Sequence, residues 1–151
     1  DGMGGAAAGE VASEIFAQTT LDIFSINPNR SEKDTLYRVQ KAYHAANEKI
    51  LEHVSAHPDH KGMGCTAELL AFFEENFILG HIGDSRTYRL RNDVLEQLTE
   101  DHSLLNDYIK MKKLTKEEIE NFPHKNVIVR GLDDIEILPI ETDFWRFYRL
   151  L

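Results

Sequence analysis

The sequence lacks several features that would narrow its class. It has one cysteine, Cys65, among 151 residues, so it cannot form an internal disulfide framework, and a reducing compartment such as the cytoplasm is the expected location. No apolar run approaches the roughly 18 residues that a membrane-spanning helix needs, and no signal peptide is visible. Without an apolar span we do not expect the membrane as a partner.

Basic residues are also scarce, since Lys and Arg total 17 against 26 Asp and Glu. Phosphate contacts need a basic patch, so we do not expect nucleic acid as a partner. The formal net charge of −9 is compatible with metal cations, because carboxylates are hard oxygen ligands. The length and the hydrophobic fraction of 42% fit one globular domain over residues 1–151.

Two helices are predicted in the first third of the chain. Residues 9–24 carry apolar side chains on one face, and residues 36–54 repeat them at steps of three and four. Ser31, with Asp34 three positions later, resembles a capping box and marks a helix start.

Short strands are predicted next. Over residues 65–99, apolar or alternating runs are separated by turns of two or three residues. This spacing is typical of antiparallel hairpins, because parallel strands need long crossovers. Helical segments follow at 103–113 and 116–122, and strand-like segments at 126–131 and 135–141. The order predicts an α+β fold with helices packed on an antiparallel sheet.

The opening segment, DGMGGAAAGE, first raises the possibility of dinucleotide binding. Gly2, Gly4 and Ala7 match the degenerate glycine pattern, and Asp22 follows at about the 20-residue spacing of the ribose-binding acid. No strand is visible before these glycines, however, and the later hairpins are not βαβ units. The match is therefore weak.

Histidine and cysteine chemistry is a second possibility. His53, His57 and His60 lie at spacings of four and three near a helix end, which makes them a candidate metal site. A solvated helix C-terminus, where partial positive charge is favourable, is the simpler interpretation. Cys65 as a nucleophile would need a positioned histidine, and a small buried side chain at a strand start is the simpler interpretation.

A carboxylate-held metal site is the third possibility. Glycines after Asp1 permit close backbone approach, so this turn can offer a carboxylate and a glycine carbonyl to one cation. Asp84, in the segment GDSR, can add a ligand from another turn. Such oxygen donors suit Mg²⁺ and Mn²⁺. Acids are also common as plain turn residues, and the spacing leaves both interpretations open.

Four segments in this order resemble the protein phosphatase 2C (PPM) family of metal-dependent serine/threonine protein phosphatases. They are DGMGGAAAGEVAS, GMGCTAELL, GHIGDSRTYRLR with LTEDHSLL, and FPHKNVIVRGL. The DGMGG form, with Met3, is similar to the bacterial branch. The resemblance implies an αββα sandwich of two antiparallel sheets flanked by helix pairs. It also implies hydrolysis of phosphoserine and phosphothreonine through a water activated by two Mn²⁺ or Mg²⁺ ions. The implied partners are phosphorylated proteins and a bacterial Ser/Thr kinase, with the phosphatase a monomer.

The resemblance also assigns roles to residues. Asp1 matches the family's catalytic aspartate that bridges the two metals, and Gly2 matches the glycine whose carbonyl binds one of them. Asp84 matches the acid associated with a third, weaker metal, although a plain hairpin-turn role is equally compatible with the sequence.

Other matched positions are expected to be structural or to meet the substrate. Asp101 and His102 match a motif that we interpret as structural, and Ser85 and Arg86 are expected to order their turn. Residues 103–129 match a flap-like insertion beside the active site that affects substrate choice. Its lysines, which either meet a phosphoprotein or lie on a solvated helix face, are Lys110, Lys112 and Lys113.

The departures from the family pattern matter as well. Met3 replaces a histidine found in many eukaryotic members, so water or another group would have to protonate the leaving oxygen. Cys65 replaces Ser or Thr, and the segment 131–133 departs from the usual RALG. The family also expects further acids before DGMGG and after FYRLL. We therefore expect an internal piece of the catalytic domain, truncated at both ends, that binds metals weakly and is inactive alone. The alternative is a non-catalytic regulatory relative, a pseudophosphatase.

Overall fold

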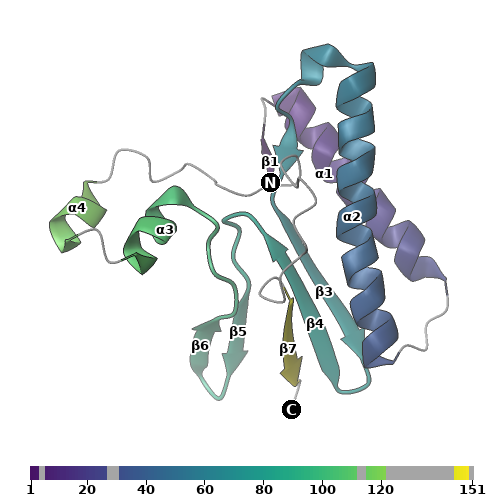
Figure 1. Cartoon of the computed structure of the whole chain (residues 1–151). Coiled ribbons are helices and arrows are strands. Elements are labelled where there is room, and N and C mark those ends of the chain that lie inside the picture. Colours follow the sequence, from purple (N-terminus) through teal and green to yellow (C-terminus); the bar gives the residue numbers. More distant parts are fainter. Residues whose placement is uncertain (4–5, 27–30, 112–114, 122–144, 150–151) are drawn as a thin grey trace.

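The computed structural model describes residues 1–3, 6–26, 31–111, 115–121 and 145–149 (Figure 1). The elements in chain order are β1 (Gly2–Met3), α1 (Ala6–Ser25), α2 (Glu32–Ala56), the 3₁₀ helix η1 (Pro58–His60), β2 (Gly64–Cys65), β3 (Ala67–Phe73), β4 (Asn76–Ile82), β5 (Tyr88–Arg91), β6 (Val94–Gln97), α3 (Leu104–Lys110), α4 (Lys116–Glu120) and β7 (Trp145–Arg149). Helices and antiparallel strands in this order confirm the predicted α+β class.

The two long helices form where apolar periodicity predicts them, and both extend a few residues further. The start of α2 is fixed by Ser31, whose hydroxyl accepts a hydrogen bond from the Asp34 N–H at 3.2 Å. This contact satisfies one of the N–H groups that a helix start leaves without an intrahelical partner. Helix α4 begins with a full capping box between Thr115 and Glu118.

The central sheet has the order β3-β4-β7. β3 and β4 pair from Ala67 opposite Ile82 to Phe73 opposite Asn76, and β7 adds to the far edge of β4. β5 and β6 form a separate hairpin, and β1 pairs with β2. All these pairings between described strands are antiparallel, so this part of the chain holds no βαβ unit for a dinucleotide.

The core lies between the helix pair and the central sheet, with α1 and α2 on one side of β3 and β4 (Figure 1). The Tyr43 hydroxyl on α2 donates a hydrogen bond to the Ala67 carbonyl on β3 at 3.0 Å, and the ring meets Phe16 of α1 edge-on. The fully buried members of this core include Ala12, Val39, Ile50, Met63, Cys65 and Ile78. The packing holds β2 and β3, and the turn between them, firmly against the helices.

Several predicted segments lie outside the described residues. They are the strands at 126–131 and 135–141, the departure at 131–133 and most of the second half of the flap-like insertion 103–129. Within the described part of the chain, no helix combines the length and apolarity needed to cross a membrane.

Candidate metal centre

The opening acid is held by the strand pair β1–β2. Gly2 lies opposite Cys65, and the Thr66 N–H donates to the Asp1 carbonyl at 2.8 Å. The Asp1 nitrogen donates to the Thr66 hydroxyl at 3.0 Å. These contacts with Thr66 fix the main chain of Asp1. Asp1 stays exposed, so its side chain is available to a ligand.

Two glycines allow this opening strand to lie directly on helix α1. A Cβ on Gly2 would be 2.3 Å from the backbone carbon of Gly9, and a Cβ on Gly9 would be 2.6 Å from the backbone carbon of Gly2. Any other residue at either position would force the two backbones apart. The spacing of Gly2 and Gly9 thus has a packing reason that places Asp1 beside the start of the helix.

Thr66 connects the Asp1 turn to the Asp84 turn. Its hydroxyl lies 2.7 Å from the Ser85 hydroxyl and also accepts from the Asp1 nitrogen. On its other side, Gly83 has φ +105°, and a Cβ there would lie 2.5 Å from the Thr66 Cγ2. The structure therefore brings the two predicted acids onto neighbouring turns. Sequence reasoning did not single out Thr66; its place directly after Cys65 in the GMGCT segment was the available signal.

The segment after β6 closes over the Asp84 turn. The His102 N–H donates to the Gly83 carbonyl at 2.8 Å, and the Gly83 N–H donates to His102 Nδ1 at 3.1 Å. The Arg86 guanidinium binds both carboxylate oxygens of Asp101, with its shortest contact at 2.6 Å. These bonds to Asp101, together with one to Tyr88, raise the pKa of Arg86. The contacts agree with a structural interpretation of Asp101 and His102 and with Arg86 as a residue that orders the turn.

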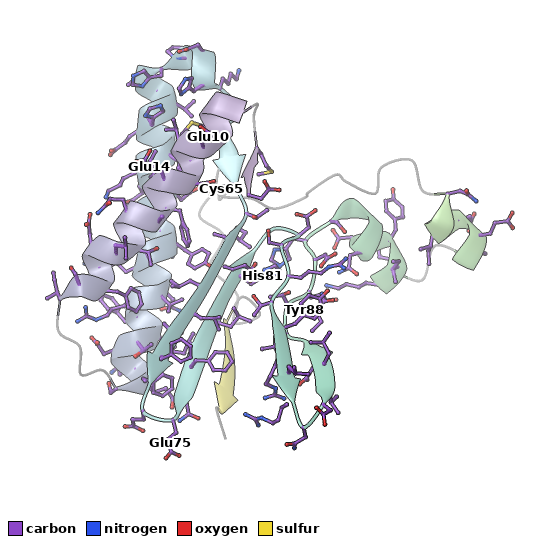
Figure 2. The ribbon with its side chains drawn as sticks, turned by 180° about the vertical axis from the view of Figure 1, so that it is seen from behind. Glu10, Glu14, Cys65, Glu75, His81 and Tyr88 are labelled. Carbon is purple, nitrogen blue, oxygen red and sulfur yellow. The ribbon has the colours of Figure 1, made fainter. Side chains whose placement is uncertain are left out.

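A polar pair, the buried His81 and the partly buried Glu68, supports the segment that contacts this turn. His81 is 7% exposed, and its Nδ1 bonds to the Glu68 carboxylate while its Nε2 lies 2.7 Å from the Glu100 carbonyl. Figure 2 shows His81 between the central sheet and the β5–β6 hairpin. Sequence reasoning missed both residues. The hairpin register places Glu68 directly opposite His81. Two polar residues within largely apolar strands were therefore a signal for this pair.

The donors at the two turns suit a hard cation rather than zinc. Asp1 and Asp84 offer carboxylate oxygens and Gly2 a carbonyl. A hydrated divalent cation needs only one or two protein carboxylates, because waters complete its shell. In the part of the chain that the structure describes, no group of three His, Cys, Asp or Glu could hold a metal ion. A closed structural zinc site, which takes four protein ligands, is therefore a poor fit for these residues.

The three histidines do come together, but they bond to one another. The His53 Nε2 lies 3.0 Å from the His60 Nδ1, and the His53 ring stacks on His57 with centroids 4.2 Å apart. Partial desolvation and the neighbouring imidazoles lower the pKa of His53. The cluster lies at the C-terminal end of α2, in keeping with the simpler interpretation. Cys65 is fully buried in β2, which fits a packing role rather than a nucleophile.

Comparison with known proteins decides the family. The family model described as Protein phosphatase 2C matches residues 1–143. The chain belongs to the protein phosphatase 2C family.

Individual relatives agree with this assignment. Serine/threonine phosphatase stp of Listeria innocua is 33% identical over 150 residues, a match covering 94% of this chain and 60% of that protein. The S. agalactiae serine/threonine phosphatase structure superposes with a TM-score of 0.87 at 31% identity, covering 100% of this chain and 61% of that one. The PstP catalytic domain, solved with 2 manganese ions, gives 0.81 at 32% identity, covering 100% and 60%.

These matches confirm the predicted family and its phosphatase 2C type of α+β fold. The first relatives are also longer than this chain, which spans about 60% of their length.

Proposed function

We propose that the protein is a metal-dependent serine/threonine phosphatase that hydrolyses phosphoserine and phosphothreonine in other proteins. The observation that carries this proposal is the link through Thr66, which holds the Asp1 turn and the Asp84 turn side by side. Membership of the phosphatase family and the names of the relatives support the same reaction.

The roles of the site residues follow from the groups that they present. The Asp1 carboxylate and the Gly2 carbonyl are the donors for the main centre, and the Asp84 carboxylate serves a weaker third site. When bound, a pair of Mn²⁺ or Mg²⁺ ions would supply Lewis acidity and an activated water for attack on phosphorus. The hydrogen bond between the Thr66 and Ser85 hydroxyls holds the Asp1 turn next to the Asp84 turn. Met3 carries no titratable group, so it cannot protonate the leaving oxygen.

Substrate choice is assigned to the flap-like insertion 103–129. In its described part, Lys110 pairs with Glu100 at 3.2 Å, with both side chains about half exposed. Such a pair is weak, so Lys110 can exchange Glu100 for a phosphoprotein at little cost. Lys112 and Lys113 lie outside the described residues. A Ser/Thr kinase and its targets as partners, a cytoplasmic location and a monomeric state stay predictions.

The regulatory alternative has one observation in its favour. Described residues supply one acid, Asp1, to the main centre and one, Asp84, to the weaker third site, and they form no three-ligand group. Two carboxylates without further ligands hold a divalent cation weakly, so this chain on its own is expected to bind metal poorly and turn over little. If the full-length protein supplied no further acids to the centre, it would keep the phosphatase fold but would not catalyse hydrolysis.

Hydrolysis of a phosphothreonine peptide by the full-length protein, with and without Mn²⁺, separates the two functions. The enzyme is expected to need Mn²⁺, and Asp1→Ala should lower kcat/KM at least about a hundredfold, because a metal ion contributes several kcal/mol to such a reaction. Asp59→Ala is the matched control, since Asp59 is an exposed acid on η1, outside the candidate centre. A folded wild type without Mn²⁺-dependent activity would favour the regulatory relative.

A further inference from the structure

We propose that His81 is a positioning residue of the Asp84 turn: a buried imidazolium that joins the Glu68 carboxylate to the Glu100 backbone and so fixes the segment that closes over the turn. Its effect on metal binding rests on the proposed function. Its protonation state and its contacts do not depend on that function.

The charge on His81 follows from counting protons. A backbone carbonyl can only accept, so the contact of 2.7 Å between Nε2 and the Glu100 oxygen requires a proton on Nε2. The partner of Nδ1 is a carboxylate oxygen of Glu68, so one proton lies between these two groups. The second oxygen of Glu68 receives the Thr87 hydroxyl at 2.9 Å. A carboxylic acid ordinarily gives up its proton more readily than an imidazolium, so we place the shared proton on Nδ1. A ring with N–H groups at both nitrogens is an imidazolium.

The groups around the ring favour this state. Burial by itself lowers the pKa of His81, but the hydrogen bond and charge of Glu68, the Glu100 carbonyl and the charge of Asp101 outweigh it, and the pKa is raised. Among the described residues, His102 is a further titratable neighbour, and its ring centroid lies 4.6 Å away. Its Nδ1 accepts the Gly83 N–H, so His102 is in the neutral Nε2–H tautomer and adds no like charge.

The path from His81 to the metal turn is short and consists of hydrogen bonds. Holding the Glu100 carbonyl fixes the start of the closing segment. The carboxylate of the next residue, Asp101, accepts hydrogen bonds from Arg86, which follows the Asp84 turn in the chain. The one after it, His102, exchanges two hydrogen bonds with Gly83 on the other side. These contacts lie on both sides of Asp84. The bond from His81 supports the segment that makes them, together with the Asn106 amide, which donates to the Asp101 carbonyl at 2.8 Å.

Glu68 and His81 depend on each other. The side chains are only 22% and 9% exposed, so removing either one leaves a poorly solvated charge or an unpaired donor behind. The two residues belong to adjacent strands and lie directly opposite in the register. We therefore expect substitutions at the two positions to act as one unit rather than to add.

The first test measures the protonation state of the His81 ring directly. ¹⁵N NMR of histidine side chains in the full-length protein distinguishes an imidazolium from the neutral tautomers. At pH 6.5, the ordinary histidine pKa, the His81 ring is expected to be mainly protonated on both nitrogens because its pKa is raised, while His102 carries one proton on Nε2. A neutral His81 ring would overturn the inference whether or not the protein proves to be a phosphatase.

The second test measures Mn²⁺ binding by calorimetry, which needs no catalysis. Glu68→Gln and His81→Gln are each expected to weaken the Asp84-dependent site about tenfold, the scale of one lost buried hydrogen bond to a charged group. The double variant should be no weaker than either single variant. The matched controls are Glu96→Gln and His44→Gln, exposed residues on β6 and α2 that should leave binding unchanged.

Circular dichroism confirms that each variant is folded before titration. Unchanged Mn²⁺ binding in folded Glu68→Gln and His81→Gln proteins contradicts the positioning role, as does a fully additive double variant. Hydrolysis is recorded separately, so a protein with the predicted ring state and binding losses but no activity would count against the phosphatase proposal alone.

Discussion

Substitution of Gly83 by alanine tests the packing of the two turns most sharply. Gly83 has φ +105°, a conformation that side chains rarely adopt, and is buried beneath the turn that carries Asp84. The added Cβ would lie 2.5 Å from the Thr66 Cγ2, 2.6 Å from its Cβ and 3.1 Å from its Cα. The last two atoms belong to the rigid part of Thr66, so a rotamer change cannot relieve the contact.

Two costs combine in this variant. The backbone conformation costs about 1–3 kcal/mol, and inserting a methyl group into a filled space costs about 1–3 kcal/mol more. We therefore expect Gly83→Ala to lower the free energy of unfolding by about 2–6 kcal/mol, a large share of a typical domain's stability of about 5–15 kcal/mol.

Gly62 provides the matched control. Its φ of +81° is also positive, but a Cβ there would meet nothing within 4 Å. Gly62→Ala should therefore show only the backbone cost, about 1–3 kcal/mol. Urea unfolding of the two variants of the full-length protein, followed by circular dichroism, gives the difference. Equal losses, within about 0.5 kcal/mol, would show that Thr66 does not crowd Gly83 and would refute the described contact between the turns.

Three further outcomes follow from the contacts. The stability that His81 contributes through Glu68 should be complete below about pH 6.5, the ordinary histidine pKa, and lost as the pH rises through its raised folded pKa; urea unfolding of wild type and His81→Gln across pH measures this difference, and a constant difference would contradict it. Tyr43→Phe removes a buried hydroxyl that donates to β3 and should cost about 1 kcal/mol in the same assay. Arg86→Lys cannot bind both oxygens of Asp101 and should raise the Mn²⁺ concentration for half-maximal activity several-fold, whereas an unchanged requirement would show that this ion pair does not order the turn.

Much of the fold was predictable because its signals are local. The period of apolar residues located both long helices, and the turn spacing located both described hairpins. The start of α2 at Ser31 follows from side-chain to backbone bonding within one turn. Strands predicted at 126–131 and 135–141 fall outside the described residues and stay predictions.

The arrangement of the candidate site was predictable only in part. The family motifs around Asp1 and Asp84 indicated these two acids, but neither motif includes Thr66. The Thr66 hydroxyl contacts Asp1, which lies 65 residues away in the chain, and Ser85, which lies 19 residues away. Contacts of that range depend on how the sheet packs on the helices, which a local pattern does not encode. The pair of Glu68 and His81 is intermediate, because a hairpin register read outward from the turn between Phe73 and Asn76 would have placed them opposite each other.

The most direct test of the metal centre is anomalous diffraction at the manganese edge from crystals of the full-length protein grown with Mn²⁺. The account predicts anomalous peaks within ligand distance of the Asp1 carboxylate and the Gly2 carbonyl, with a weaker peak at Asp84. A well-ordered Asp1 turn with no peak beside it, in crystals that hold Mn²⁺ elsewhere, would contradict the assignment of these residues as the metal centre.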